Sequence, residues 1–149
     1  MENNIIRVKT ENEASICDKL LTKLIQDERK YDSFINDNFI VKDYFKNVIK
    51  DENNILLAFE ENKIIKGYIY LKYIETDGKA GYLIDGLYVL ENYRNCGISK
   101  KLIEEALKIL TNKNIEFIDI NVMYQNELAK NIYKHFGFKN FKITMRKIV

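Results

Sequence analysis

The stretch from Leu87 to Lys101 (LYVLENYRNCGISKK) joins the end of an apolar strand, a loop containing Gly97 and the start of an amphipathic helix. The first backbone N–H groups of a helix have no intrahelical partners, and that end of the helix is partly positive. Gly97 would let the backbone approach a bound group closely, and Lys100 and Lys101 add positive charge. The stretch therefore predicts an anion site, most naturally for phosphates. On these residues alone, a plain strand–helix loop with two solvated lysines is an equal alternative. Neither a Walker A loop nor the dinucleotide fingerprint G-x-G-x-x-G is present.

A second stretch, Asn126 to Phe138 (NELAKNIYKHFGF), has helical periodicity and ends at a glycine. Asn126 and Tyr133 are nearly two turns apart, so they share a face with Ala129 between them. We expect Leu128, Ile132 and Phe136 on the core-facing side. His135, the single histidine, is about 200° from Tyr133 around the helix and is expected to face away, at the surface or rim.

Together the two stretches resemble a known family. The segment YVLENYRNCGIS is similar to motif A of the GNAT N-acetyltransferase superfamily, Q/R-x-x-G-x-G/A, through Arg94 and Gly97. Ser99 departs from the usual Gly or Ala, and Cys96 replaces a common Lys or Arg, which removes one phosphate contact. The second stretch resembles motif B, N-x-x-A-x-x-x-Y-x-x-x-G-F, and the separation of the two motifs agrees.

The resemblance implies acetyl-CoA as cosubstrate. A single histidine and the lack of zinc-like Cys/His spacing predict no metal site. The pyrophosphate would lie on the backbone amides of the loop and helix start, and the pantetheine arm would lie between strands 82–90 and 116–121. The residues that the resemblance assigns to acetyl-CoA are Leu87, Tyr88, Val89, Arg94, Asn95, Cys96, Gly97, Ser99, Lys100, Asn126, Ala129 and Tyr133.

Transfer of an acetyl group to an amine requires removal of a proton, because alkyl amines are mostly protonated at neutral pH. The Val89 N–H would stabilise the developing oxyanion, and Tyr133 matches the family position of the acid that protonates the leaving thiolate. Tyr133 could instead simply fill a gap between helix and strand. Asp85 is a candidate base or acceptor contact, with Glu91 acting through water as the alternative. Strand alternation puts Asp85, Leu87 and Val89 on one face, unless the strand bulges near Gly86.

The acceptor side is less defined. Tyr31, Phe34 and Phe39 flank a loop that often shapes the acceptor pocket in this superfamily, although they could equally anchor that loop in the core. The chain after Phe138 is shorter than in many members, which implies an open pocket or one completed by a second subunit of a homodimer. The expected acceptor is an amine-bearing small molecule or a peptide.

The elements that must position these residues follow from periodicity. Strands are expected over residues 5–9, 55–60, 64–74, 82–90, 116–121 and 141–148, and helices over 13–29, 39–50, 98–110 and 126–136. The fold class is α/β (α+β): a mixed, mostly antiparallel sheet with one parallel β-α-β crossover and helices on both faces. Residues 1–149 form a single domain without repeats or linkers.

Composition excludes several other classes of protein. A net charge of +2, with 24 basic and 22 acidic residues interleaved, argues against nucleic-acid binding. Two cysteines and no apolar leader or membrane-length segment predict a cytoplasmic protein without membrane contact. The prediction is an acyl-CoA-dependent N-acetyltransferase, with a non-catalytic acyl-CoA-binding module of the same fold as the alternative.

Overall fold

Five strands form one sheet in the order β1-β2-β3-β4-β5 in the computed structural model, which describes residues 4–149. The strands are β1 (Ile5–Arg7), β2 (Ile55–Glu61), β3 (Ile64–Thr76), β4 (Lys79–Val89) and β5 (Phe117–Ile120). Neighbours pair antiparallel except β4 and β5, which are parallel. The predicted mixed sheet with one parallel crossover is confirmed.

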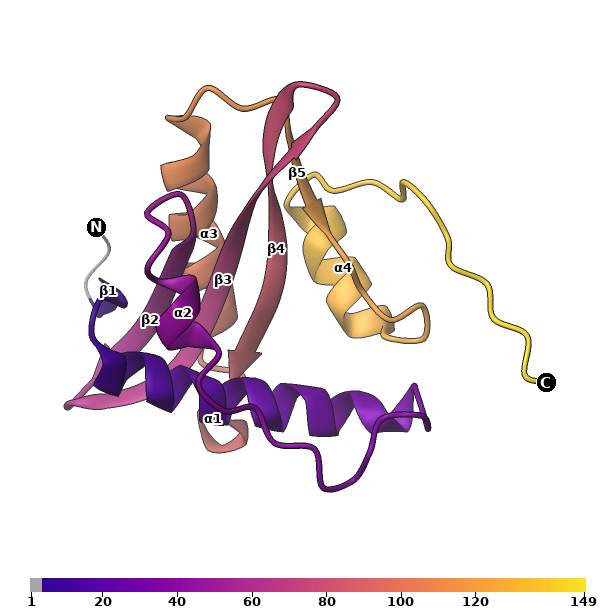
Figure 1. Ribbon diagram of the computed structural model, residues 1–149, viewed down its shortest axis with the longest axis horizontal. Coiled ribbons are helices and arrows are strands. Elements are labelled where there is room, and N and C mark those ends of the chain that lie inside the picture. Colours follow the sequence, from indigo (N-terminus) through magenta and orange to yellow (C-terminus); the bar gives the residue numbers. More distant parts are fainter. Residues whose placement is uncertain (1–3) are drawn as a thin grey trace.

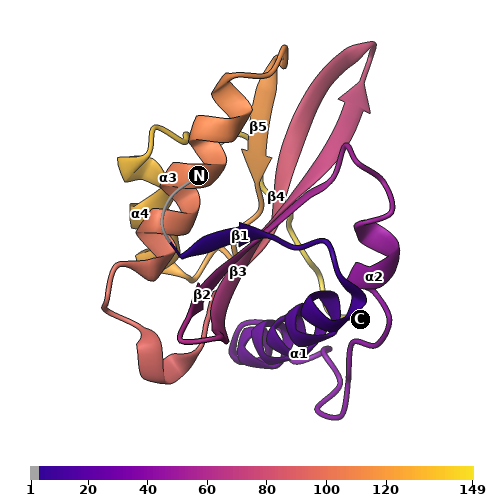
Figure 2. The ribbon, with the colours of Figure 1, turned by 90° about the vertical axis from the view of Figure 1, so that its left-hand side faces the viewer.

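Helices cover both faces of this sheet (Figures 1 and 2). They are α1 (Glu11–Asp27), α2 (Phe45–Val48), α3 (Ile98–Thr111) and α4 (Glu127–His135), with short 3-10 turns η1 (Glu28–Lys30) and η2 (Glu91–Tyr93). Figure 2 shows α1 and α2 on one side of the sheet and α3 and α4 on the other. Two buried clusters match these layers. Leu102 and Ile103 of α3 belong to one, which also contains Ile84 and Val89, and Cys17 and Phe45 belong to the other, which also contains Tyr68.

The predicted helix over residues 39–50 is wrong in extent, because only Phe45–Val48 is α-helical. Asp43 has a positive φ of 57°, which interrupts a right-handed helix. Side chains of α1 hold the preceding loop in another path: Thr22 Oγ1 accepts from Val41 N at 3.0 Å, and Gln26 Nε2 donates to Phe39 O at 2.9 Å. Asp18, buried in α1, accepts from Phe45 N at 3.0 Å.

The predicted strand over residues 141–148 is also wrong. This segment has no regular secondary structure, and Phe141, Ile143 and Met145 are exposed. Figure 1 shows it running from the end of α4 away from β5. A strand needs a hydrogen-bonding neighbour, whereas Arg146 instead holds this segment to Asp32, with Nη1 at 3.0 Å from Oδ1.

Candidate active site

A bulge in β4 decides the geometry of the site. Tyr70 pairs with Gly86 and Leu71 pairs with Ile84, so Asp85 is an extra residue with no partner on β3. Ile84 and Leu87 consequently pack on the same α3 face despite their odd spacing. The prediction from simple alternation, which groups Asp85 with Leu87 and Val89 on one face, is therefore wrong. The strand bulges near Gly86, which is the case in which that alternation was expected to fail.

The bulge also sets the direction of the backbone amides. Leu90 N donates to Lys66 O at 2.9 Å, so alternation along an antiparallel pair turns Tyr88 toward β3 and turns Leu87 and Val89 away from it. On that other side, β5 pairs with β4 only from Gly81 to Ile84. The N–H groups of Leu87 and Val89 therefore point into the space where β4 and β5 diverge.

The loop after β4 presents the uncapped end of a helix. Asn95 and Gly97 have positive φ angles of 64° and 80°, and Gly97 is the N-cap of α3 with no side-chain cap hydrogen bond. No heavy atom lies within 4 Å of the position where a Cβ of Gly97 would stand. The first amides of α3 are thus free to bind an anion.

A cavity of about 510 Å³ opens at this helix end. Its walls come from β4, the loop, α3 and α4, through Val89, Tyr93, Arg94, Asn95, Gly97, Ile98, Ser99, Lys100, Leu128, Asn131, Ile132, His135 and Phe136. Val89 of β4 and Gly97 of the loop therefore border the same cavity. The Cys96 side chain is exposed and its Sγ lies 3.6 Å from Arg94 O.

The side chain of Arg94 is used within the protein. Its Nε donates to Val89 O at 2.9 Å, and Nη2 is 3.3 Å from Asp27 Oδ2 at the end of α1. The guanidinium lies over the ring of Tyr88, 5.1 Å from its centroid. Arg94 thereby occupies the Val89 carbonyl and links α1 to the loop, a role the sequence analysis did not assign.

The face that α4 turns to this cavity differs from the prediction. The sequence predicts that Leu128 faces the core and that His135 faces away from the site. In the structure both residues line the cavity, and Leu128 is 75% exposed. Asn126 caps α4, since its Oδ1 accepts from Ala129 N at 3.1 Å. Which side of this nine-residue helix meets the cavity depends on the angle of its axis to the sheet. Periodicity alone does not give that angle.

Tyr133 is half-buried against the α3-face core and beside the ring of Phe138. Its hydroxyl makes no hydrogen bond within residues 4–149. Burial raises the pKa of Tyr133 to about 12, so the hydroxyl stays protonated over the physiological range. A protonated hydroxyl suits a proton donor.

Asp85 projects toward the opposite face of β4 from Ile84 and is exposed. Partial desolvation raises the pKa of its carboxyl, and nearby Lys72 offsets part of that rise. No hydrogen bond or ion pair to the carboxylate exists among residues 4–149. An exposed carboxylate without a partner beside the β4 bulge is available to a ligand.

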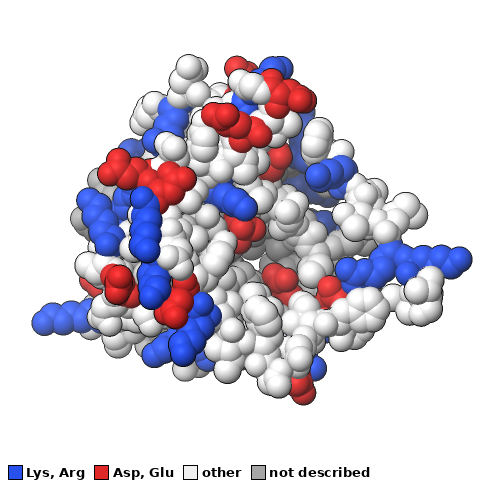
Figure 3. All heavy atoms as spheres, viewed as in Figure 1, with Lys and Arg blue, Asp and Glu red and all other residues white. Residues whose placement is uncertain are grey.

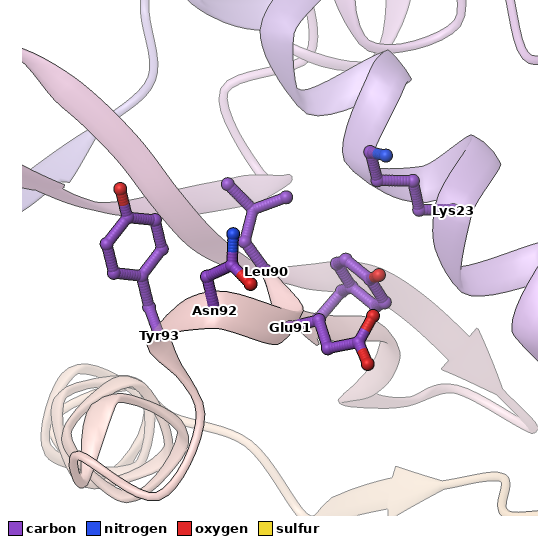
Figure 4. A pocket seen from close by; sticks show the side chains of 6 residues that line it. Lys23, Leu90, Glu91, Asn92 and Tyr93 are labelled. Atoms are coloured by element: carbon purple, nitrogen blue, oxygen red, sulfur yellow. The ribbon is translucent and has the colours of Figure 1, made fainter.

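Glu91, the alternative base, lies elsewhere. It lines a pocket of about 210 Å³ on the α1 side, together with Lys23, Tyr88, Leu90, Asn92 and Tyr93. Figure 4 shows Lys23 of α1 across this pocket from the loop that carries Glu91. Glu91 thus faces a smaller, separate pocket, and Asp85 is the carboxylate at the bulge itself.

The proposed acceptor-side aromatics are not core anchors. Phe34 is 67% exposed and Phe39 is 46% exposed, and the guanidinium of Arg146 lies 5.2 Å from the Phe34 ring centroid. Tyr31 is half-buried, with Lys30 Nζ at 5.0 Å from its ring centroid. In Figure 3 the surface is hollowed near the middle of the molecule, with acidic side chains at the hollow.

Comparison with known proteins identifies the family. The model of the acetyltransferase (GNAT) family matches residues 19–138. The chain belongs to the GNAT family. It is 35% identical over 78 residues to an N-alpha-acetyltransferase of Sulfurisphaera tokodaii, and 32% identical over 79 residues to a thialysine N-epsilon-acetyltransferase of Mus musculus. Each alignment covers 52% of this chain and 46% of the relative, so the similarity spans about half of each.

A solved structure shares the fold of this chain. A mutant BH1408 protein from Bacillus halodurans superposes with a TM-score of 0.82 at 20% identity, covering 97% of this chain and 98% of that one. Within residues 4–149, no helix has the length and apolar character needed to cross a membrane.

Proposed function

We propose that this GNAT protein transfers an acetyl group from acetyl-CoA directly to a primary amine of a small molecule or peptide. The observation that carries the proposal is the uncapped N-terminus of α3, which opens into the 510 Å³ cavity beside the free amides of β4. The residues present fit acetyl-CoA, because the space at Gly97 leaves the helix amides accessible to a diphosphate. Two free cysteines are compatible with the reducing cytoplasm that we expect.

Backbone groups of the loop and of β4 bind acetyl-CoA in this proposal. The amides of Ser99 and Lys100 hold the diphosphate, and the Leu87 backbone binds the pantetheine arm. The Val89 N–H donates to the thioester oxygen as negative charge develops on it. Since Arg94 occupies the Val89 carbonyl, the strand end keeps its orientation while this N–H is used.

Proton movements complete the proposal. Asp85 draws the cationic amine to the bulge and accepts its proton, directly or through water. The amine nitrogen then bonds to the thioester carbon and loses its second proton to water as the carbon–sulfur bond breaks. The Tyr133 hydroxyl supplies a proton to the leaving thiolate and regains one from solvent. The Tyr133 hydroxyl is protonated at neutral pH, because burial raises its pKa from an already high ordinary value to about 12.

Release of free CoA thiol in the presence of an amine panel tests the function. The panel should contain alkyl diamines, aminoglycosides, amino acids and peptides with free N-termini. We expect amine-dependent thiol release with acetylated amine as the product. Tight acetyl-CoA binding without thiol release for any amine would instead identify a non-catalytic acyl-CoA-binding module.

A further inference from the structure

Three tyrosines gather around the β4 bulge on the face covered by α1 and α2. Tyr68 and Tyr70 come from β3, and Tyr44 immediately precedes α2. The rings of Tyr44 and Tyr70 meet edge to face at 6.4 Å, and Phe45 lies 5.5 Å from both Tyr68 and Tyr70. Tyr68 and Tyr70 are buried, whereas Tyr44 is 39% exposed, so the cluster reaches the surface at Tyr44.

Asp85 belongs to the same place. Tyr70 pairs across the sheet with Gly86, next to the unpaired Asp85, and alternation from Ile84 directs Asp85 to the tyrosine face. The Asp85 charge contributes to raising the pKa values of the Tyr44 and Tyr70 hydroxyls, after desolvation as the main cause, which places these groups within electrostatic reach. The positive charge of Lys72 lowers the pKa of the Asp85 carboxyl and so offsets part of the rise caused by desolvation.

One hydroxyl of this cluster has no partner. The Tyr68 oxygen is fully buried and makes no hydrogen bond within the described part of the chain. It lies 2.7 Å from the position that a Cβ at Gly86 would take, so it points directly at the bulge. Leaving a buried hydroxyl unpaired is unfavourable, and a hydrogen-bonding group brought by a ligand, directly or through water, would remove that cost.

We propose that Asp85, Tyr44 and Tyr70 form the subsite for the accepting amine, and that it selects alkyl ammonium groups whose own carbon carries no carboxylate. This inference rests on the proposed function and names its substrate class. The carboxylate offers charge, and tyrosine oxygens accept hydrogen bonds from the N–H groups of an ammonium. A carboxylate on the amine-bearing carbon would be brought close to Asp85 and repelled.

Direct binding tests the subsite apart from turnover. Calorimetric titration of 1,5-diaminopentane into CoA-saturated protein should show saturable binding, with glycine binding at least about tenfold more weakly. Tyr44→Phe and Asp85→Asn should each weaken diamine binding by about tenfold or more and leave the acetyl-CoA affinity unchanged. Tyr70→Phe should act in the same direction.

Tyr73→Phe is the matched control, because Tyr73 lies on the other face of β3 and its hydroxyl donates to Glu75 Oε1 at 2.8 Å. It should leave diamine binding unchanged. Diamine affinity unaffected by both Tyr44→Phe and Asp85→Asn, or equal affinity for glycine and diamine, would overturn the inference. If Tyr44→Phe and Asp85→Asn weaken diamine binding as expected but no amine causes thiol release, the subsite would stand and the proposed transferase function would be contradicted.

Discussion

At the scale of single residues, the proposed chemistry depends on side chains whose pKa values are raised by burial. The half-buried Tyr133 is protonated at neutral pH, as any tyrosine is, and burial raises its pKa further to about 12. We therefore expect Tyr133→Phe to lower kcat by roughly 10²-fold or more, a usual contribution of general acid catalysis. The ring is retained beside Phe138, so acetyl-CoA affinity and thermal stability should stay near those of the parent.

Steady-state kinetics and calorimetry measure the two effects of Tyr133→Phe separately. Tyr124→Phe is the matched control, because this tyrosine is 74% exposed and is not placed in the site. Equal kcat for parent and Tyr133→Phe would remove the hydroxyl from the mechanism.

Asp85 makes a prediction about stability and pH. Its folded-state pKa lies above the ordinary value of 3.8, so ionisation costs more in the folded protein than in the unfolded chain. Asp85→Asn should therefore raise the free energy of unfolding at neutral pH while lowering activity. The gain should shrink as pH falls through the raised folded pKa and vanish below the ordinary value. Urea unfolding at several pH values measures this, and a variant less stable at neutral pH would contradict it.

The two cysteines should differ in reactivity. Burial, with the neighbouring Asp18 and Glu13, raises the pKa of Cys17 to about 12, so its thiolate is scarce at neutral pH. Cys96 is exposed in the loop before α3. Iodoacetamide should label Cys96 in the folded protein, and acetyl-CoA should slow that labelling. Labelling of Cys17 before Cys96 would contradict the difference in reactivity, and no protection at Cys96 would contradict the proposed position of the diphosphate.

At the scale of elements, the loop and α3 form the central unit. Gly97→Ala should destabilise the protein by about 1 kcal/mol, because a side chain at positive φ is strained. It should also weaken acetyl-CoA binding, since the new methyl group enters the space above the helix amides. Gly78→Ala provides the control: Gly78 has a φ of 78° and equally open surroundings, but lies in the β3–β4 turn. Similar acetyl-CoA affinities for both variants would contradict the assignment.

The largest differences between the predicted and the observed structure concern the bounds of secondary-structure elements. The periodicity of α3 and the strands up to β5 predicted those elements well, because their apolar faces pack on one side of a sheet. The residues 141–148 alternate in the same way, yet form no strand without a neighbouring strand to bond. The bulge at Asp85 could only be anticipated from Gly86, because register depends on pairing with β3. Likewise, the contacts of Arg94 with Val89 and Asp27 depend on the tertiary path of α1.

At the scale of the whole molecule, β4 separates the two halves of the proposed reaction. The cavity is lined by α3 and α4, and the tyrosine cluster packs under α1 and α2. Figure 2 shows these two pairs of helices on opposite sides of the sheet. The bulge lets β4 contribute to both sides. It turns the N–H groups of Leu87 and Val89 into the gap beside β5, and it turns the Asp85 carboxylate to the opposite face. Sequence motifs predicted the proposed acetyl-CoA half, whereas the proposed acceptor half could be described only from the fold.

The C-terminal segment joins this acceptor half through Arg146. Its contacts with Asp32 and Phe34 hold the segment against the loop between α1 and α2. We expect Arg146→Ala to raise the KM for the amine severalfold and to leave the Kd for acetyl-CoA unchanged. Lys147→Ala, at the next exposed position, should change neither value. A changed Kd for acetyl-CoA with an unchanged KM for the amine would place the segment in the acetyl-CoA half of the site and contradict this prediction.

The most direct test of the central claim is calorimetric titration of acetyl-CoA into the unmodified protein. We expect saturable binding of one acetyl-CoA per chain, with affinity that weakens when the diphosphate and the 3′-phosphoadenosine are removed and only acetylpantetheine is offered. No heat of binding at millimolar acetyl-CoA, or equal affinity for the thioester lacking the diphosphate, would contradict it.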